Sequence, residues 1–254
     1  MKKTRSQTMQ KNYKLTIAYD GTRYKGWQSQ KTTDTTIQGK LSHVFSGLEG
    51  KQTEVHGSGR TDAGVHALGQ VANVYLETEK TIPEIMEYVN HYLPEDIGVT
   101  AMEEAPKKFH ARLFAVKKTY CYRIHNSALP NVFERKWMCQ IKEPLDVAAM
   151  KEAARYFEGT HDFAAFCRHR QKKKTTVRTV YQLSVAQQGS EIDITVTGNG
   201  FLHNMVRIIA GTLVEVGQGI REPQDIPKLL EGGVRAESGI TMPAKGLILK
   251  SVEY

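Results

Sequence analysis

Hydrophobic and polar residues alternate along several short stretches of the chain, and this period of two predicts strands with one buried face. The alternation is cleanest from Tyr13 to Tyr19, and Asp20-Gly21-Thr22 supplies turn residues at its end. Further strands are predicted over 70–76, 119–125, 180–186, 191–197 and 246–254. The dipeptide Gln188-Gly189 between two of these strands predicts a hairpin, and hence antiparallel pairing.

Between the strands, apolar residues recur at helical spacing. Helices are predicted over 37–48, 82–93, 147–157, 204–216 and 226–230. Residues suited to capping precede three of these helices, namely Thr35 with Gln38, Thr81 with Glu84, and Asp146. Helices and strands interleave, but the hairpins favour an α+β fold with a mainly antiparallel sheet over a doubly wound parallel one.

The chain shows no internal repeat and no low-complexity linker. Its softest boundary lies near 105–112, after Pro106-Lys107-Lys108. We therefore expect a basic N-terminal tail over 1–12, an N-terminal half over 13–108 and a C-terminal half over 109–254.

Composition narrows the class of protein. With 254 residues and 40% hydrophobic residues, the chain is long enough for a sizeable core. It lacks an apolar run of the roughly 20 residues that cross a bilayer. Its N-terminal basic stretch has no apolar segment after it, which argues against a secretory signal. We expect a cytoplasmic protein, and the wide spacing of Cys121, Cys139 and Cys167 argues against disulfides and a cysteine-rich zinc site.

The net charge of +8 is unevenly distributed. No acidic residue precedes Asp20, and the block from Arg168 to Arg178 holds six lysines or arginines and no acid. A run of this kind is usually a solvated loop. Two acid-free basic segments on one chain nevertheless favour a polyanionic partner, and nucleic acid fits best.

One glycine-rich segment carries an isolated carboxylate. Asp62 lies within Gly57-Ser58-Gly59-Arg60-Thr61-Asp62-Ala63-Gly64, just before the strand predicted over 70–76. Glycines let the backbone approach a ligand, and loops on rigid scaffolds often carry catalytic groups. Arg60 has two possible roles, orienting a phosphate or pairing with Asp62. The alternative is a structured turn without chemistry.

The helix predicted over 204–216 is apolar nearly all round, which implies burial on both sides. Arg207 is the exception. Either its side chain reaches the surface near the start of the helix, or it meets an anion, because an unpaired buried charge is very costly. Asp62 is the obvious candidate for that anion.

The segment Arg60-Thr61-Asp62-Ala63-Gly64-Val65-His66-Ala67 resembles the signature of the tRNA pseudouridine synthase A family. Other stretches are similar to motifs of that family in the same order: Tyr19-Asp20-Gly21-Thr22-Arg23-Tyr24-Lys25-Gly26-Trp27-Gln28, Phe109-His110-Ala111-Arg112, Lys118-Thr119-Tyr120, Phe201-Leu202-His203-Asn204-Met205-Val206-Arg207 and Gly246-Leu247. The resemblance spans about 13–254. Several long motifs in a fixed order make a specific signal.

The resemblance implies an isomerase that converts uridine to pseudouridine in the anticodon stem-loop of tRNA (tRNA positions 38–40). It implies no cofactor and no metal. It also implies a homodimer, and a long, mainly antiparallel sheet flanked by helices and built from two related halves with the active-site cleft between them.

The resemblance also implies roles for single residues. Asp62 matches the catalytic aspartate, which attacks the nucleoside or abstracts a ribose proton. Tyr120 matches a tyrosine that stacks on the base, and Arg207 matches the basic partner of the aspartate. Arg60 matches an arginine that holds the flipped nucleotide, and Leu247 matches an apolar pocket wall. Asn73 departs from the pattern, since many relatives have histidine there, and we expect this to affect packing.

The basic block is expected to bind the tRNA substrate through Arg168, Arg170, Lys172, Lys173 and Lys174. Two other functions compete with the synthase. One is a tRNA-binding protein or chaperone without catalysis, against which the trio Asp62, Tyr120 and Arg207 argues. The other is a nuclease or glycosylase, but a metal nuclease needs clustered carboxylates, which the chain lacks.

Overall fold

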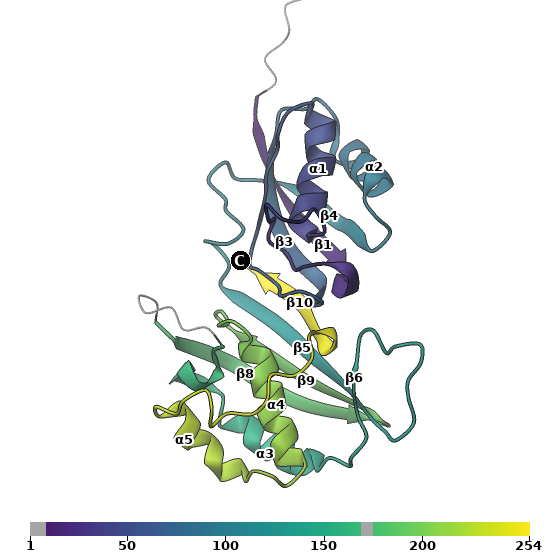
Figure 1. Ribbon diagram of the computed structural model, residues 1–254. Helices are drawn as coiled ribbons and strands as arrows, with labels where there is room; N and C mark the ends of the chain where they lie inside the picture. Colours follow the sequence, from purple (N-terminus) through teal and green to yellow (C-terminus); the bar gives the residue numbers. More distant parts are fainter. Residues whose placement is uncertain (1–8, 169–174) are drawn as a thin grey trace, which may run out of the picture. The chain divides into compact units, whose positions relative to one another are not determined.

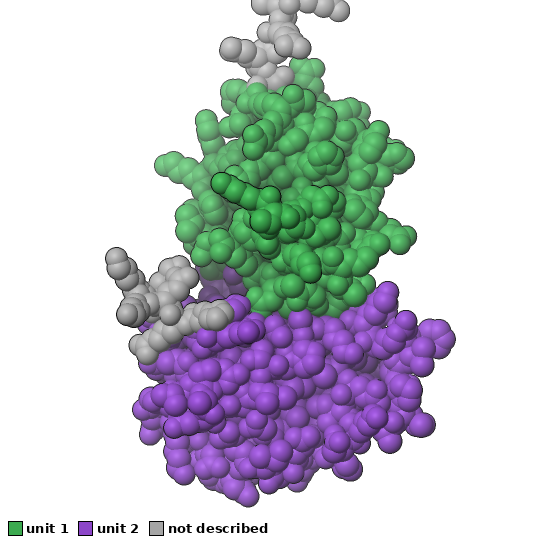
Figure 2. Space-filling view, in the orientation of Figure 1, with its two compact units in different colours: residues 1–115 green, residues 116–254 purple. Residues whose placement is uncertain are grey.

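The chain forms two compact units, Met1–Ala115 and Val116–Tyr254 (Figure 2). The computed structural model describes residues 9–168 and 175–254. The division falls at Ala115, whereas the sequence placed it after Lys108. Strands pair mainly antiparallel in both units and helices accompany them, so the predicted α+β class is confirmed (Figure 1).

In the first unit, three strands run in the order β4-β1-β3, and β2 pairs with β3, all antiparallel. The strands are β1 (Lys11–Tyr19), β2 (Val55–Gly57), β3 (His66–Leu76) and β4 (Ile97–Ala105). Helices α1 (Ile37–Glu49) and α2 (Ile82–Tyr92) lie side by side on one face of this sheet (Figure 1). A 3-10 turn, η1 (Gly21–Arg23), follows β1 and is capped by Asp20.

In the second unit, five strands run in the order β10-β5-β9-β8-β7 with antiparallel neighbours, and β6 pairs with β5 in parallel. The strands are β5 (Lys117–Asn126), β6 (Cys139–Ile141), β7 (Gly159–Asp162), β8 (Val177–Gln188), β9 (Glu191–Gly198) and β10 (Leu247–Glu253). Helix α3 (Val147–Arg155) packs on β8 and on α4 (Met205–Gly217), while α5 (Ile226–Leu230) follows later. The shorter turns are η2 (Ala164–Phe166), η3 (Pro223–Asp225) and η4 (Ala244–Gly246).

The helix caps test the local sequence signals. Glu84 accepts hydrogen bonds from the backbone N–H and the hydroxyl of Thr81, both at 2.7 Å, as predicted. These bonds stabilise the carboxylate and lower the pKa of Glu84. The box predicted from Thr35 and Gln38 is wrong. The cap of α1 is Thr36, whose hydroxyl accepts from Gly39 N, because Gln38 is buried and uses its amide elsewhere.

The cysteines and the largest core side chains are buried. All three cysteines are free and buried. Trp27 in the first unit and Tyr122 in the second are among the largest fully buried side chains. Burial raises the pKa of the Cys121 thiol to about 11, which keeps it protonated at neutral pH. None of the helices in the described part of the chain is long and apolar enough to cross a membrane.

Two buried asparagines fasten the segment 106–112 to the sheet of the first unit. Asn73 and Asn12 are 0% and 2% exposed, and Asn73 donates to Asn12 at 3.1 Å. Asn12 donates in turn to the carbonyls of Pro106 (3.0 Å) and Phe109 (2.8 Å), and Asn73 accepts from Ala111 N at 2.9 Å. Asn73 therefore serves packing through polar contacts, which anchor a motif shared with the family that the sequence resembles.

Replacing Asn73 with alanine removes the acceptor of a buried N–H and the donor to Asn12. Leaving buried polar groups unsatisfied costs about 1–3 kcal/mol each, so we expect Asn73→Ala to lower the free energy of unfolding by about 3 kcal/mol. Urea unfolding measures this. Asn131→Ala is the matched control, since the side-chain hydrogen bonds of half-buried Asn131 within 9–168 and 175–254 are to Glu134 in its own loop, and the change should cost about 1 kcal/mol or less. Equal losses in the two variants would contradict the anchoring role.

Candidate active site

In the first unit, Asp62 lies on the loop between β2 and β3, and a neighbouring segment holds that loop by its backbone. Trp27 N donates to Thr61 O at 3.0 Å, and Gly64 N donates to Tyr24 O at 3.3 Å. Within the loop, Val65 N donates to Asp62 O at 3.2 Å. The half-buried Asp62 is therefore bracketed by fixed backbone on both sides.

Gly26 makes this close approach possible. Its φ of +96° is a conformation that L side chains rarely adopt. A Cβ atom at Gly26 would lie 2.7 Å from Thr61 O and 3.2 Å from Asp62 C. Only a glycine lets these two stretches of backbone approach so closely. Gly26 is part of the motif over 19–28 that the sequence analysis found.

The segment that contains Gly26 and Trp27 also accepts hydrogen bonds from the first turn of α1. Ile37 N donates to Gly26 O at 3.2 Å, and Gln38 N donates to Trp27 O at 2.9 Å. The Trp27 ring is 2% exposed and covers Gly57, where an added Cβ would come within 2.4 Å of it. The residues 24–27 thus form a cradle, hereafter the Trp27 cradle, between α1 and the Asp62 loop.

A buried hydroxyl pair fixes the residue next to Asp62. The Tyr19 hydroxyl lies 2.8 Å from Thr61 Oγ1, and Tyr19 is 5% exposed. Burial raises the pKa of Tyr19 to about 12, although hydrogen bonds to Thr61 and Gln70 act in the opposite direction. Tyr19 therefore stays neutral and gives the loop an uncharged anchor.

At the start of the same loop, Ser58 donates to Gln70 Oε1 at 2.7 Å, and Gln70 Nε2 donates to Gly59 O at 3.2 Å. Arg60 follows and its side chain is exposed. Its Nε–H donates to Gln28 Oε1 at 2.9 Å. Of the two roles considered for Arg60, pairing with an acid is not realised with any residue of 9–168 or 175–254.

In the second unit, Tyr120 lies on β5 and is 9% exposed. The rings of Tyr120 and Phe201 form a T-shaped pair, with centroids 5.2 Å apart and planes at 86°. Leu249 and Leu247 on β10 stand opposite Tyr120 and Tyr122. Cross-strand partners share a face of a sheet, so Leu247 and Tyr120 lie on the same face of the second unit's sheet.

Arg207 lies in the first turn of α4, a helix that is buried on nearly every side, as predicted. Its side chain is half-buried, and its Nε–H donates to Met242 O at 2.7 Å. Met242 N returns a bond to Arg207 O at 3.2 Å. These two bonds fix the position of Nε, from which the rest of the guanidinium extends. They also connect α4 to the chain that leads into β10.

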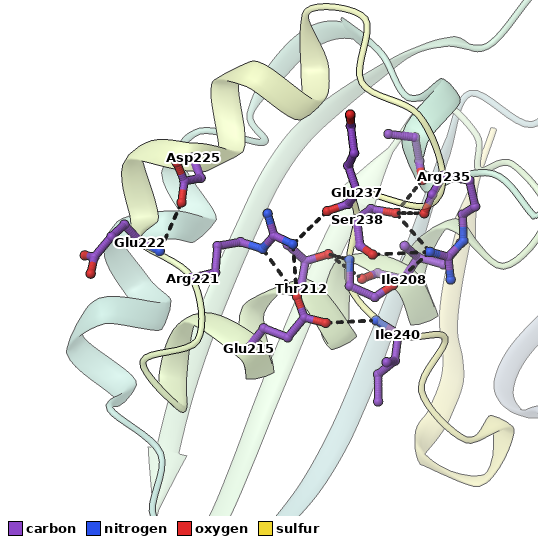
Figure 3. A network of polar contacts seen from close by, with 12 residues as sticks. Ile208, Thr212, Glu215, Arg221, Glu222, Asp225, Arg235, Glu237, Ser238 and Ile240 are labelled. Atoms are coloured by element: carbon purple, nitrogen blue, oxygen red, sulfur yellow. Dashed lines mark hydrogen bonds and ion pairs between the residues drawn. The ribbon is translucent and has the colours of Figure 1, made fainter.

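The segment 235–242 is fastened along α4 by a polar network (Figure 3). Thr212 Oγ1 accepts from Gly239 N at 2.9 Å, and Glu215 accepts from Ile240 N at 3.2 Å. Arg221 bridges Glu215 at 3.1 Å and the carbonyl of Glu237 at 2.7 Å (Figure 3). The network sets the register between Arg207 and the residues that follow Met242, and it was not predicted from the sequence.

The basic block, residues 168–178, begins beside the motif over 201–207 in the second unit. Arg168 is exposed, and its backbone N–H donates to His203 O at 3.1 Å. At the far end of the block, Thr179 and Asn199 exchange backbone and side-chain hydrogen bonds at 3.0 Å. Four of the predicted substrate-binding residues lie outside the described residues, namely Arg170, Lys172, Lys173 and Lys174. No cluster of three or more metal-ligating side chains occurs within 9–168 and 175–254.

Comparison with known proteins identifies the family. A family model described as tRNA pseudouridine synthase matches residues 15–113 and 153–254. The tRNA pseudouridine synthase A 2 of Bacillus cereus is 48% identical over 96% of this chain and 99% of its own length. The tRNA pseudouridine synthase A 1 of Clostridium tetani is 45% identical over 96% of this chain and 100% of its own length.

The chain is therefore an isomerase of the pseudouridine synthase class. It belongs to the tRNA pseudouridine synthase A family, which confirms the resemblance found in the sequence.

Tyr19 gives a pH-dependence that tests the buried anchor. The unfolded tyrosine releases its proton near pH 10, whereas the folded protein holds it until about pH 12. The unfolded state then binds fewer protons, so the free energy of unfolding falls as pH rises from 10 to 12. At about 1.4 kcal/mol per pH unit, the loss amounts to roughly 2–3 kcal/mol.

Urea unfolding of wild type and Tyr19→Phe at pH 8 and at pH 11.5 measures this effect. We expect the phenylalanine variant to lack this part of the loss, so that the gap between the two proteins narrows or reverses at high pH. Parallel curves at both pH values would mean that Tyr19 is not shielded from solvent.

Proposed function

We propose that this protein isomerises uridine to pseudouridine in the anticodon stem-loop of tRNA, at tRNA positions 38–40. Its membership of the tRNA pseudouridine synthase A family supports the reaction class. The observation that carries the assignment of the site is Asp62, a carboxylate fixed on a rigid loop by the Trp27 cradle.

The reaction breaks the bond from ribose C1′ to uracil N1, turns the base and joins C1′ to C5. The hydrogen on C5 leaves as a proton, and N1 gains one, so the product is an isomer. We propose that the Asp62 carboxylate begins this sequence, either by attacking the sugar or by removing a ribose proton. A rigid loop suits both roles, because a displacement of about 1 Å in a reacting group can cost about a hundredfold in rate.

Arg207 is proposed as the cationic partner of Asp62. A close guanidinium keeps a carboxylate ionised, which a nucleophile or base requires. The half-buried position of Arg207 in an apolar helix supports this role, since a cation placed there gains most from an anionic partner. The bond from its Nε to Met242 O fixes the point from which the guanidinium extends.

Tyr120 and Leu247 are proposed to hold the uracil. A base inside a stem must be flipped out, which costs a few kcal/mol. Stacking on an aromatic ring returns about 1–3 kcal/mol. Tyr120 forms a T-shaped pair with Phe201, and Leu247 lies on the same face of the sheet as Tyr120, which supports an aromatic and apolar pocket.

Binding of tRNA is proposed to use Arg60 and the basic block with Arg168, Arg170, Lys172, Lys173 and Lys174. Contacts with phosphates are independent of sequence and weaken steeply with salt. The protein is further proposed to be cytoplasmic. It is also proposed to act as a homodimer, and light scattering of the purified protein tests this oligomeric state.

The decisive assay uses tRNA carrying tritium at C5 of uridine, because forming the C1′–C5 bond expels that hydrogen. We expect wild type to release tritium, and Asp62→Asn to be slower by at least about a thousandfold while binding tRNA normally. Asp34→Asn is the matched control, because Asp34 is a surface carboxylate whose side chain is 86% exposed, and it should retain full activity.

Each rival function predicts a different outcome of this assay. A tRNA-binding protein without catalysis would bind tRNA in a salt-sensitive way and release no tritium. A glycosylase would yield free uracil. Full activity of Asp62→Asn would contradict the catalytic role of Asp62 while leaving the reaction itself in place.

A further inference from the structure

Arg60 is the only cation next to Asp62 on its loop, and its guanidinium is held from one side. A guanidinium carries five N–H donors. The Nε–H of Arg60 donates to Gln28 Oε1 at 2.9 Å. No other hydrogen bond of this guanidinium is made within the described ranges, so its two Nη groups remain for a ligand.

The amide of Gln28 is in turn held by Gln38. Gln28 Nε2 donates to Gln38 Oε1 at 2.6 Å. Across the described part of the chain, Gln28 uses its side chain for these two bonds alone, one to Gln38 and one from Arg60. Among the described residues, the Gln28 amide therefore makes no hydrogen bond to the backbone. It links the side chains of Gln38 and Arg60.

Gln38 is 4% exposed, and its orientation is dictated by the main chain. Its Oε1 accepts from Ser29 N at 2.8 Å, and its Nε2 donates to Val55 O at 2.9 Å. A backbone N–H can only donate and a carbonyl can only accept, so the amide of Gln38 has a single polarity that satisfies both. The flip of this side chain is thereby fixed.

The orientation of the Gln38 amide determines the orientation of the Gln28 amide, which in turn determines the position of Arg60. Because Gln38 offers Oε1, Gln28 must present its NH₂ group inward, and its Oε1 then faces Arg60 Nε. A carbonyl at this point can only receive an N–H, which fixes the direction from which the planar guanidinium extends. The order Val55–Gln38–Gln28–Arg60 forms a relay of defined direction, from β2 through the start of α1 to the surface.

We propose that Gln38 and Gln28 are positioning residues for the isomerisation, and that they aim the Nη edge of Arg60 at an RNA phosphate next to the reacting uridine. A planar two-donor edge suits a phosphate, and presetting its direction reduces the entropy lost on binding. This proposal rests on the proposed function. It adds two neutral amides that act through Arg60.

A double-mutant cycle tests the relay. The variants are Gln28→Ala, Arg60→Ala and the two together, and the readout is kcat/KM for tritium release. Residues that act through one another show interaction energies equivalent to about 2- to 150-fold. We expect Gln28→Ala to lower kcat/KM about tenfold in wild type, and to change it less than about twofold once Arg60 is alanine.

A merely structural Gln28 would cost the same factor in both backgrounds, and that result would overturn the proposal. So would wild-type activity of Gln28→Ala. Gln187→Ala is the matched control, because the exposed Gln187 amide also donates a hydrogen bond, to Gly189 O at 3.2 Å, but lies in the hairpin of β8 and β9, and it should leave kcat/KM unchanged.

Gln38 is tested in the same way with Gln38→Leu, which keeps the volume and removes the polarity. We expect a loss of activity in wild type that disappears in the Arg60→Ala background, even if the variant is less stable. Wild type releasing no tritium would overturn the proposed function, whereas normal release with an additive cycle would overturn the relay alone.

Discussion

The close approach of Gly26 and Trp27 to the Asp62 loop is the constraint on which the candidate site depends. Two backbone hydrogen bonds, from Trp27 N to Thr61 O and from Gly64 N to Tyr24 O, join two segments that are far apart in sequence. The carbonyls of Gly26 and Trp27 meanwhile hold the first turn of α1. The carboxylate, the arginine beside it and the helix behind them are therefore positioned by one short stretch of backbone. The proposed reactivity of Asp62 depends on this arrangement more than on the acid itself.

In the second unit, hydrogen bonds position the candidate residue Arg207. Arg207 lies in an apolar helix, and two hydrogen bonds with Met242 fix the position of its backbone and of its Nε. The network of Thr212, Glu215 and Arg221 then holds the chain before Met242 against α4 (Figure 3). In each unit by itself, hydrogen bonds within the protein hold the polar groups of the candidate residues in place, which is the condition for the electrostatic catalysis that the proposed function requires.

The sequence predicted much of this protein and missed its polar connections for a physical reason. Periodicity found β1, α4 and the β8–β9 hairpin, because burial repeats along each element. It missed β4, an edge strand with an irregular burial pattern, and the short strands β2, β6 and β7. Gln38 shows the limit best. Its spacing from Thr35 suggested a capping box, but its amide bonds Val55, Ser29 and Gln28, and contacts between distant segments leave no local signal.

The most direct test of the account is the activity of Gly26→Ala measured beside its stability and its affinity for tRNA. The added Cβ would lie 2.7 Å from Thr61 O, and the φ of +96° at this position is strained for alanine, so the close contact between Gly26 and the Asp62 loop must change. We predict a folded protein that binds tRNA normally and forms pseudouridine at least about a hundredfold more slowly. A folded Gly26→Ala variant with wild-type kcat would contradict the claim that the Trp27 cradle sets the reactivity of Asp62.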